Sequence, residues 1–172
     1  MRALVLSGGG AKGAYQCGAL QYILGELQVN YDAFCGVSVG AINSAYLSMF
    51  KTGQEIECVS EFTNLWSGLE TSNIYKRWKP FGRWHALWNK SFYDSSPLHT
   101  LIRKHINLDK VRNSGKLVNV GAVSLNSGKY TIFDQTCDHF IDAVIASASF
   151  PIMLSPVEFL LLRVPLSFYS LT

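Results

Sequence analysis

The chain has 172 residues, of which 48% are apolar and only 16% are charged, which excludes intrinsic disorder as its main state. A chain of this length is expected to form one compact domain. Its formal net charge of +3 argues against nucleic-acid binding, because dedicated binders usually carry a basic stripe and a pI above about 9.

The cysteines show no CxxC spacing, which argues against a zinc site and against a dense disulfide scaffold. They are Cys17, Cys35, Cys58 and Cys137. We therefore expect no metal and a reducing, cytoplasmic location. The apolar start of the chain is broken by Ser7 and three glycines before it reaches the length of a signal-peptide core, so we expect Met1 to begin the folded domain.

The first fifty residues alternate between strand and helix patterns. Residues 3–6 form a short apolar run that predicts a buried strand, and apolar residues at helical spacing predict a helix from Tyr15 to between Gln28 and Asn30. Residues 31–37 predict a second strand and residues 41–50 a second helix. This alternation indicates an α/β fold with a parallel sheet.

The later segments predict further helices and a hairpin. Helices are expected over residues 55–69, from Pro97 to His105, and over residues 138–148, where Pro151 follows. Strands at residues 117–124 and 130–133 are separated by Asn126-Ser127-Gly128, which is typical of a hairpin turn.

A glycine-rich loop joins the first strand to the first helix and consists of Gly8, Gly9, Gly10, Ala11, Lys12 and Gly13. Backbone N–H groups at such a helix start bind anions. A P-loop is excluded, because Ala14-Tyr15 replaces the Lys-Ser/Thr pair. Two interpretations stay open: a dinucleotide fingerprint with Asp32 as the ribose-binding acid, or a cradle for the oxyanion of acyl transfer.

The second motif runs from Gly36 to Gly40 and matches G-x-S-x-G, in which small flanking residues let the chain turn from strand to helix and present Ser38. A chance match has a probability of roughly 0.05 over this chain, so the motif alone is only moderately specific. Its place after the second strand, beside the glycine loop, favours a nucleophilic serine. The alternative is that Ser38 only caps the following helix.

These residues resemble the patatin-like phospholipases over residues 1–158. The resemblance rests on three segments in family order: SGGGAKGAYQCGAL, GVSVGAIN and ASASFPIMLSPVEF. It implies a three-layer α/β/α domain with a mainly parallel central sheet, acting as a lipid acyl-ester hydrolase without metal or other cofactor. Its catalytic pair would be a serine and an aspartate.

By this resemblance Ser38 is the nucleophile, and Gly9 and Gly10 are the oxyanion donors. Lys12 is a contact for a lipid phosphate. The motif glycines are Gly8, Gly13, Gly36 and Gly40.

The chain departs from the family pattern at the general base. The family's Asp-Gly-Gly or Asp-Gly-Ala motif does not follow Phe159, and no aspartate occurs after Asp142. Loss of the activating base in serine hydrolases costs on the order of 10,000-fold in rate. Asp94, Asp134 and His139 are candidates to replace it, and none is assigned to the site.

We expect residues 159–172 to be a divergent apolar tail, produced by a frameshift or truncation that leaves the fold incomplete. A membrane span is not expected in this tail, because it is too short and contains Pro165. Two other functions stay open: a catalytically dead remnant that binds lipid, and a Rossmann-like nucleotide binder.

Residues 71–93 combine five basic residues with seven aromatic ones and contain no acidic residue. This mixture is typical of a segment that contacts an anionic membrane surface. The alternative is a cap packed over the site, whose charges are merely solvated.

Overall fold

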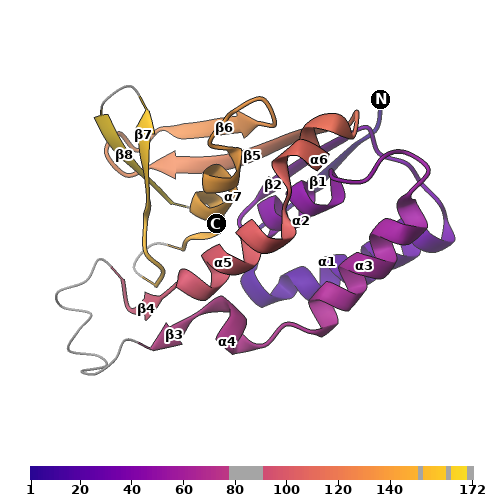
Figure 1. Ribbon diagram of the computed structural model, residues 1–172, viewed down its shortest axis with the longest axis horizontal. Helices are drawn as coiled ribbons and strands as arrows, with labels where there is room; N and C mark the ends of the chain where they lie inside the picture. The colour runs from indigo at the N-terminus through magenta and orange to yellow at the C-terminus, as the bar shows by residue number, and fades with distance from the viewer. Residues whose placement is uncertain (78–90, 151–152, 162–163, 170–172) are drawn as a thin grey trace.

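The computed structural model describes residues 1–77, 91–150, 153–161 and 164–169 (Figure 1). The parallel centre of its main sheet consists of β1 (Ala3–Leu6), β2 (Ala33–Val37) and β5 (Leu117–Ser124). Leu6 lies beside Gly36, and Val37 lies beside Gly121, so the strands end at the same edge. In open α/β sheets this carboxyl edge is where ligands bind.

Antiparallel strands extend the sheet beyond β5. β6 (Tyr130–Asp134) forms the expected hairpin with β5. β8 (Val164–Tyr169) pairs with both β5 and β7 (Val157–Leu161), so the segment expected to be a divergent tail forms a hairpin in the same sheet. The α/β class with its mainly parallel central sheet is confirmed.

The helices follow the predicted order with shifted ends. The first helix begins at Gly13, two residues early, and its last turn is a π-helix that ends at Glu26. Gln28 has a φ of 50° and breaks the helix before the expected end. The helical elements are η1 (Gly10–Lys12), α1 (Gly13–Leu20), η2 (Gln21–Glu26), α2 (Val39–Leu47), α3 (Glu55–Ser67), α4 (Thr71–Ile74), α5 (Ser96–His105), α6 (Leu108–Asn113) and α7 (Phe140–Ala148).

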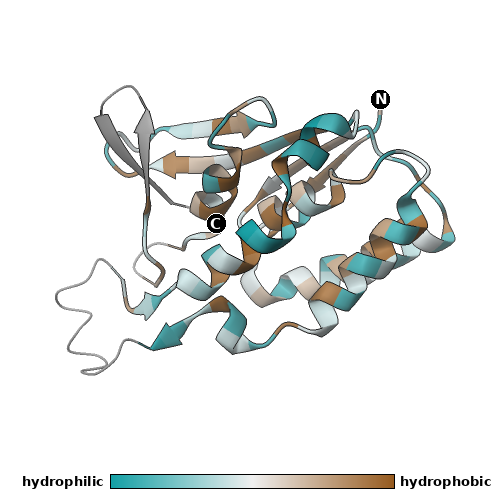
Figure 2. Cartoon of the chain, in the orientation of Figure 1, coloured by the Kyte–Doolittle hydropathy of each residue, from teal (hydrophilic) through white to brown (hydrophobic). Residues whose placement is uncertain are grey.

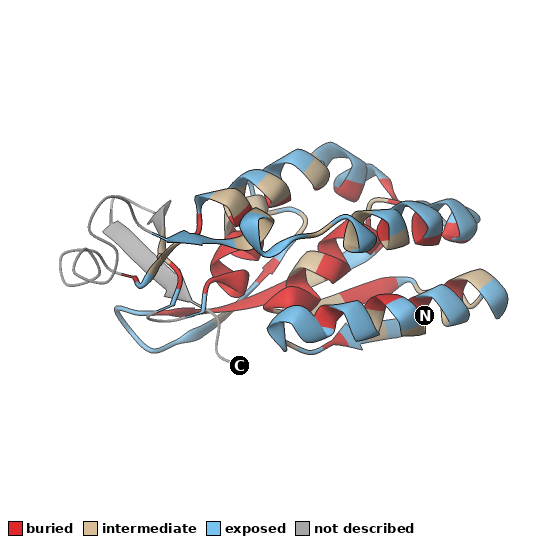
Figure 3. Cartoon of the chain, turned by 90° about the horizontal axis from the view of Figure 1, so that it is seen from below, coloured by how far each residue is buried: buried red, intermediate tan, exposed pale blue. Residues whose placement is uncertain are grey.

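Only one face of the sheet is covered by described helices. α2 and α7 contact the strands, and α1, α3 and α5 pack against these two helices. Hydrophobic residues concentrate on the central strands and on α7 (Figure 2), and the buried residues lie between strands and helices (Figure 3). Phe34, Val118 and Val120 form the centre of this core.

The opposite face of the sheet, the open face, carries exposed apolar side chains. Val5 is 74% exposed and Ile132 is 62% exposed, and the next residue along each strand, Leu6 or Phe133, is buried. The second helical layer of the expected α/β/α arrangement is therefore not seen among the described residues. No helix in the described part of the chain is long and apolar enough to cross a membrane.

The reactivity of two cysteines can test whether helices cover only one face of the sheet. We expect iodoacetamide at about pH 8 to modify Cys35, which is half-buried on the open face, and to spare Cys58, because the thiolate is the reactive form. Burial raises the pKa of Cys58 to about 12, and its side chain is 3% exposed. Peptide mass spectrometry measures both sites, with Cys35→Ser as the control. Modification of Cys58 as fast as Cys35 would contradict this packing.

Candidate active site

The two glycine motifs lie side by side at the carboxyl edge of the sheet. A Cβ atom added at Gly40 would lie 2.1 Å from the carbonyl oxygen of Leu6 and 2.7 Å from that of Ser7. One added at Gly13 would lie 2.4 Å from Val39 Cγ2. The starts of α1 and α2 are therefore held in van der Waals contact by positions that admit no side chain.

The backbone at Ser38 turns as a strand-to-helix elbow requires. Ser38 has φ 57° and ψ −127°, a conformation that costs a non-glycine residue roughly 1–3 kcal/mol and persists only when the surroundings hold it. A Cβ at Gly36 would lie 2.1 Å from the Gly40 carbonyl oxygen, so glycine is needed on both sides of the turn.

The helix-capping interpretation of Ser38 is not supported. Ser38 occupies the position before α2, but its side chain makes no capping hydrogen bond. Its carbonyl oxygen accepts from the N–H groups of Ala41 and Ile42, which starts the helix without help from the hydroxyl. Its backbone N–H donates to Ser147 Oγ at 2.9 Å.

The glycine loop adopts a conformation suited to glycine. Gly9 has φ 151° and Gly10 has φ 55°, and a short 3₁₀ turn follows. Within the described residues, the Gly9 and Gly10 N–H groups donate no hydrogen bond to another part of the chain. Both glycines and Lys12 are exposed, so these groups can meet a ligand.

A chain of hydrogen bonds fixes the start of the glycine loop. Trp66 Nε1 donates to Asn43 Oδ1 at 3.2 Å, Asn43 Nδ2 donates to Gln16 Oε1 at 2.9 Å, and Gln16 Nε2 donates to the Ser7 carbonyl oxygen at 2.8 Å. Asn43 is fully buried. These three hydrogen bonds connect α3, α2 and α1 to the residue that precedes Gly8.

Sequence reasoning missed these side chains and Ser147. A polar residue within the apolar run of α2 was the available signal for Asn43, because a buried amide needs partners. No sequence pattern indicated that Ser147, which lies 109 residues away, would contact Ser38.

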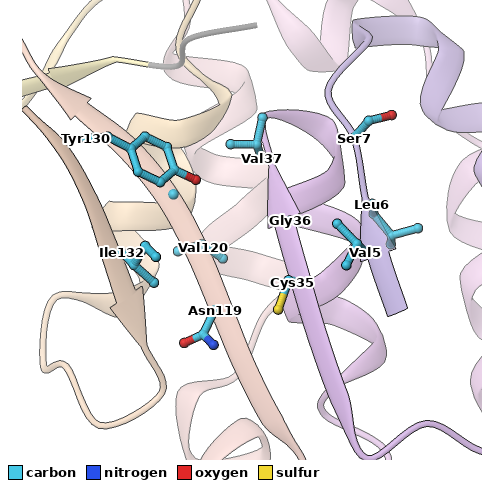
Figure 4. Close-up of a pocket in the computed structure, with 11 residues that line it drawn as sticks. Val5, Leu6, Ser7, Cys35, Gly36, Val37, Asn119, Val120, Tyr130 and Ile132 are labelled. Atoms are coloured by element: carbon cyan, nitrogen blue, oxygen red, sulfur yellow. The ribbon is translucent and has the colours of Figure 1, made fainter. Parts of the chain in front are cut away.

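Ser38 is 8% exposed, so a substrate has narrow access to it. A cavity of about 260 Å³ lies nearby on the open face of the sheet (Figure 4). Ser7, Gly36 and Val37 line it together with Tyr130 and other strand residues, whereas Ser38 and the loop glycines do not. The cavity therefore lies next to the two glycine motifs, but Ser38, Gly9 and Gly10 do not form part of its wall.

None of the candidate bases contacts Ser38 among the described residues. The Asp134 carboxylate accepts from the side chain and backbone of Thr136, and these bonds lower its pKa. The Asp94 carboxylate accepts from the Ser96 N–H. His139 precedes α7, whose rise of 1.5 Å per residue puts it about 12 Å from Ser147 along the helix axis.

The position of Asp32 contradicts the dinucleotide interpretation. Its carboxylate accepts from the Arg2 N–H at 2.6 Å, at the amino edge of β1 and β2. The four residues of β1 lie between Arg2 and Ser7, which places these two residues roughly 16 Å apart at opposite edges of the sheet. A ribose-binding acid would instead lie at the carboxyl edge with the glycine loop.

The described residues contain no group of three or more histidine, cysteine, aspartate or glutamate side chains that could hold a metal ion. The cysteines are free thiols.

Comparison with known proteins identifies the family. The family model described as patatin-like phospholipase matches residues 4–161. Uncharacterized protein L620 of Acanthamoeba polyphaga mimivirus is 31% identical over 115 residues, which are 63% of this chain and 30% of that protein.

The crystal structure of VipD from Legionella pneumophila superposes with a TM-score of 0.66 over 98% of this chain and 45% of VipD, at 14% sequence identity. The likeness to VipD therefore concerns the fold, and the chain spans less than half the length of either protein. Since the family model matches most of the chain, the chain belongs to the patatin-like phospholipase family.

Proposed function

We propose that the chain cleaves acyl esters of lipids, with Ser38 as the nucleophile and the N–H groups of Gly9 and Gly10 as oxyanion donors. Membership of a lipid acyl hydrolase family supports the reaction class. The observation that supports the assignment of residues is the close approach of Gly40 to the Leu6 and Ser7 carbonyls, because Gly40 lies two residues after the strained Ser38 and Ser7 directly precedes the glycine loop.

In the proposed reaction Ser38 Oγ attacks the ester carbonyl, and the carbonyl oxygen becomes an oxyanion. Loop N–H groups aimed at that oxygen would lower the barrier; removing one such donor typically costs about 100- to 1000-fold in rate. Collapse of the intermediate breaks the ester C–O bond and releases the alcohol, which gains the proton that the Ser38 hydroxyl lost, and leaves an acyl group on Ser38. Water then attacks this acyl group, which releases the fatty acid and restores the Ser38 hydroxyl. The exposed Lys12 would contact a phosphate of the lipid.

Proton removal from Ser38 requires a base, and no described carboxylate or imidazole hydrogen-bonds to this hydroxyl. We therefore propose that acylation by a reactive ester or phosphonate is the step that this chain performs most readily. Full turnover would be slow.

Ser38→Ala should abolish labelling by a fluorophosphonate probe, because the substitution removes the oxygen to which the probe would bond. The matched control is Ser48→Ala, since Ser48 is a fully buried serine next to the end of the same helix, and its hydroxyl donates to the Ala45 carbonyl. Gel fluorescence and peptide mapping measure the labelling. Equal labelling of both variants would exclude Ser38 as the nucleophile.

Gln16→Met should slow labelling of Ser38 by roughly 10- to 100-fold, because a shift of about 1 Å in a positioned group can cost about 100-fold. The variant preserves side-chain length but removes the bonds to Ser7 and Asn43. Its melting temperature serves as the control for folding. A labelling rate equal to that of the unmodified chain would show that the loop does not depend on Gln16.

We also propose that the protein is cytoplasmic and that its residues 71–93 contact an anionic membrane surface. Residues 78–90 of this segment lie outside the described residues. In the described part, Lys76 and Arg77 are exposed on a short strand, and Tyr75 packs on Tyr93 with ring centroids 4.6 Å apart.

Co-sedimentation with vesicles tests this contact. We expect binding to phosphatidylserine vesicles that falls in Lys76→Ala/Arg77→Ala and at high salt, because exposed basic residues near such a surface contribute about 1 kcal/mol each. Neutral vesicles are the control. Negligible binding to both would exclude the membrane contact, whereas anionic binding without any Ser38 labelling would favour a catalytically dead lipid-binding protein.

A further inference from the structure

We infer that Ser147 is a positioning residue for Ser38: its hydroxyl accepts the Ser38 N–H and holds the backbone turn in which the proposed nucleophile can react. This inference rests on the proposed function of Ser38. It assigns a role in the site to α7, which otherwise contributes to the core.

The contact joins two buried groups from distant parts of the chain. Ser147 lies in the last turn of α7 and is fully buried, and its Oγ is 2.9 Å from the Ser38 backbone nitrogen. α7 packs against both α2 and β5, so the hydroxyl is held by the core of the domain. The acceptor is therefore fixed in place independently of any substrate.

The geometry explains why an acceptor is needed at this point. Ser38 directly follows the last residue of β2, and its N–H donates to Ser147 Oγ on α7. A buried N–H without a partner is unfavourable, so an acceptor there favours the turned conformation over ordinary ones. Without it, Ser38 is expected to relax toward negative φ, which would change the direction of its side chain.

The neighbouring Ser149 provides a matched control. It is also fully buried, and its hydroxyl donates to the Ile145 carbonyl at 2.9 Å, so its bond stays within its own segment. Ser147→Ala and Ser149→Ala remove the same atom from the same end of α7. Only the first removes a bond to Ser38.

Two readouts on the folded full chain test the inference: the rate of fluorophosphonate labelling at Ser38 and the hydrogen exchange of the Ser38 amide. We expect Ser147→Ala to slow labelling by roughly 10- to 100-fold and to lose protection of that amide. Ser149→Ala should retain both, and Ser147→Thr, which keeps the oxygen, should restore them.

The outcomes separate this inference from the proposed function. Unchanged labelling and unchanged amide protection in Ser147→Ala would overturn the positioning role. Equal loss of both in Ser147→Ala and Ser149→Ala would overturn it as well, because the effect would then be general destabilisation of α7. If the unmodified chain is not labelled, the proposed function fails, while amide exchange still decides whether Ser147 holds the turn at Ser38.

Discussion

The whole candidate site depends on a backbone contact between the end of β1 and the start of α2. Gly40 packs against the Leu6 and Ser7 carbonyls at a distance that excludes any side chain. This contact sets the spacing between the glycine loop, which continues from Ser7, and the Ser38 turn, which precedes Gly40. A methyl group at this position would force the two motifs apart, and the proposed reaction needs them together.

Side chains from three further segments stabilise this arrangement. The bonds through Trp66, Asn43 and Gln16 hold the loop from the helical side, and Ser147 holds the Ser38 amide. Each of these groups has a hydrogen-bond partner on another element, and the fully buried Asn43 and Ser147 require one. The candidate site is therefore supported by side chains of α1, α2, α3 and α7, the helices that pack on the covered face of the sheet.

Local patterns predicted the elements well because each pattern has a local cause. The apolar run at residues 3–6, the hairpin turn at Asn126-Ser127-Gly128 and both glycine motifs depend on neighbours in sequence. The Ser147 contact depends on packing between distant segments, which no single-sequence pattern reports. The pairing of β8 with β5 was missed for the same reason, because strand order is a tertiary property. The dinucleotide interpretation could likewise be rejected only from the pairing of β1 with β2, which places Asp32 at the amino edge of the sheet.

A crystal structure of the chain bearing a phosphonate on Ser38 tests the central claim most directly. We expect a phosphonyl oxygen to lie about 2.7–3.1 Å from the backbone nitrogens of Gly9 and Gly10, which is the distance expected of oxyanion donors. An adduct whose oxygens all point away from the glycine loop, or a phosphonate attached to another serine, would contradict it.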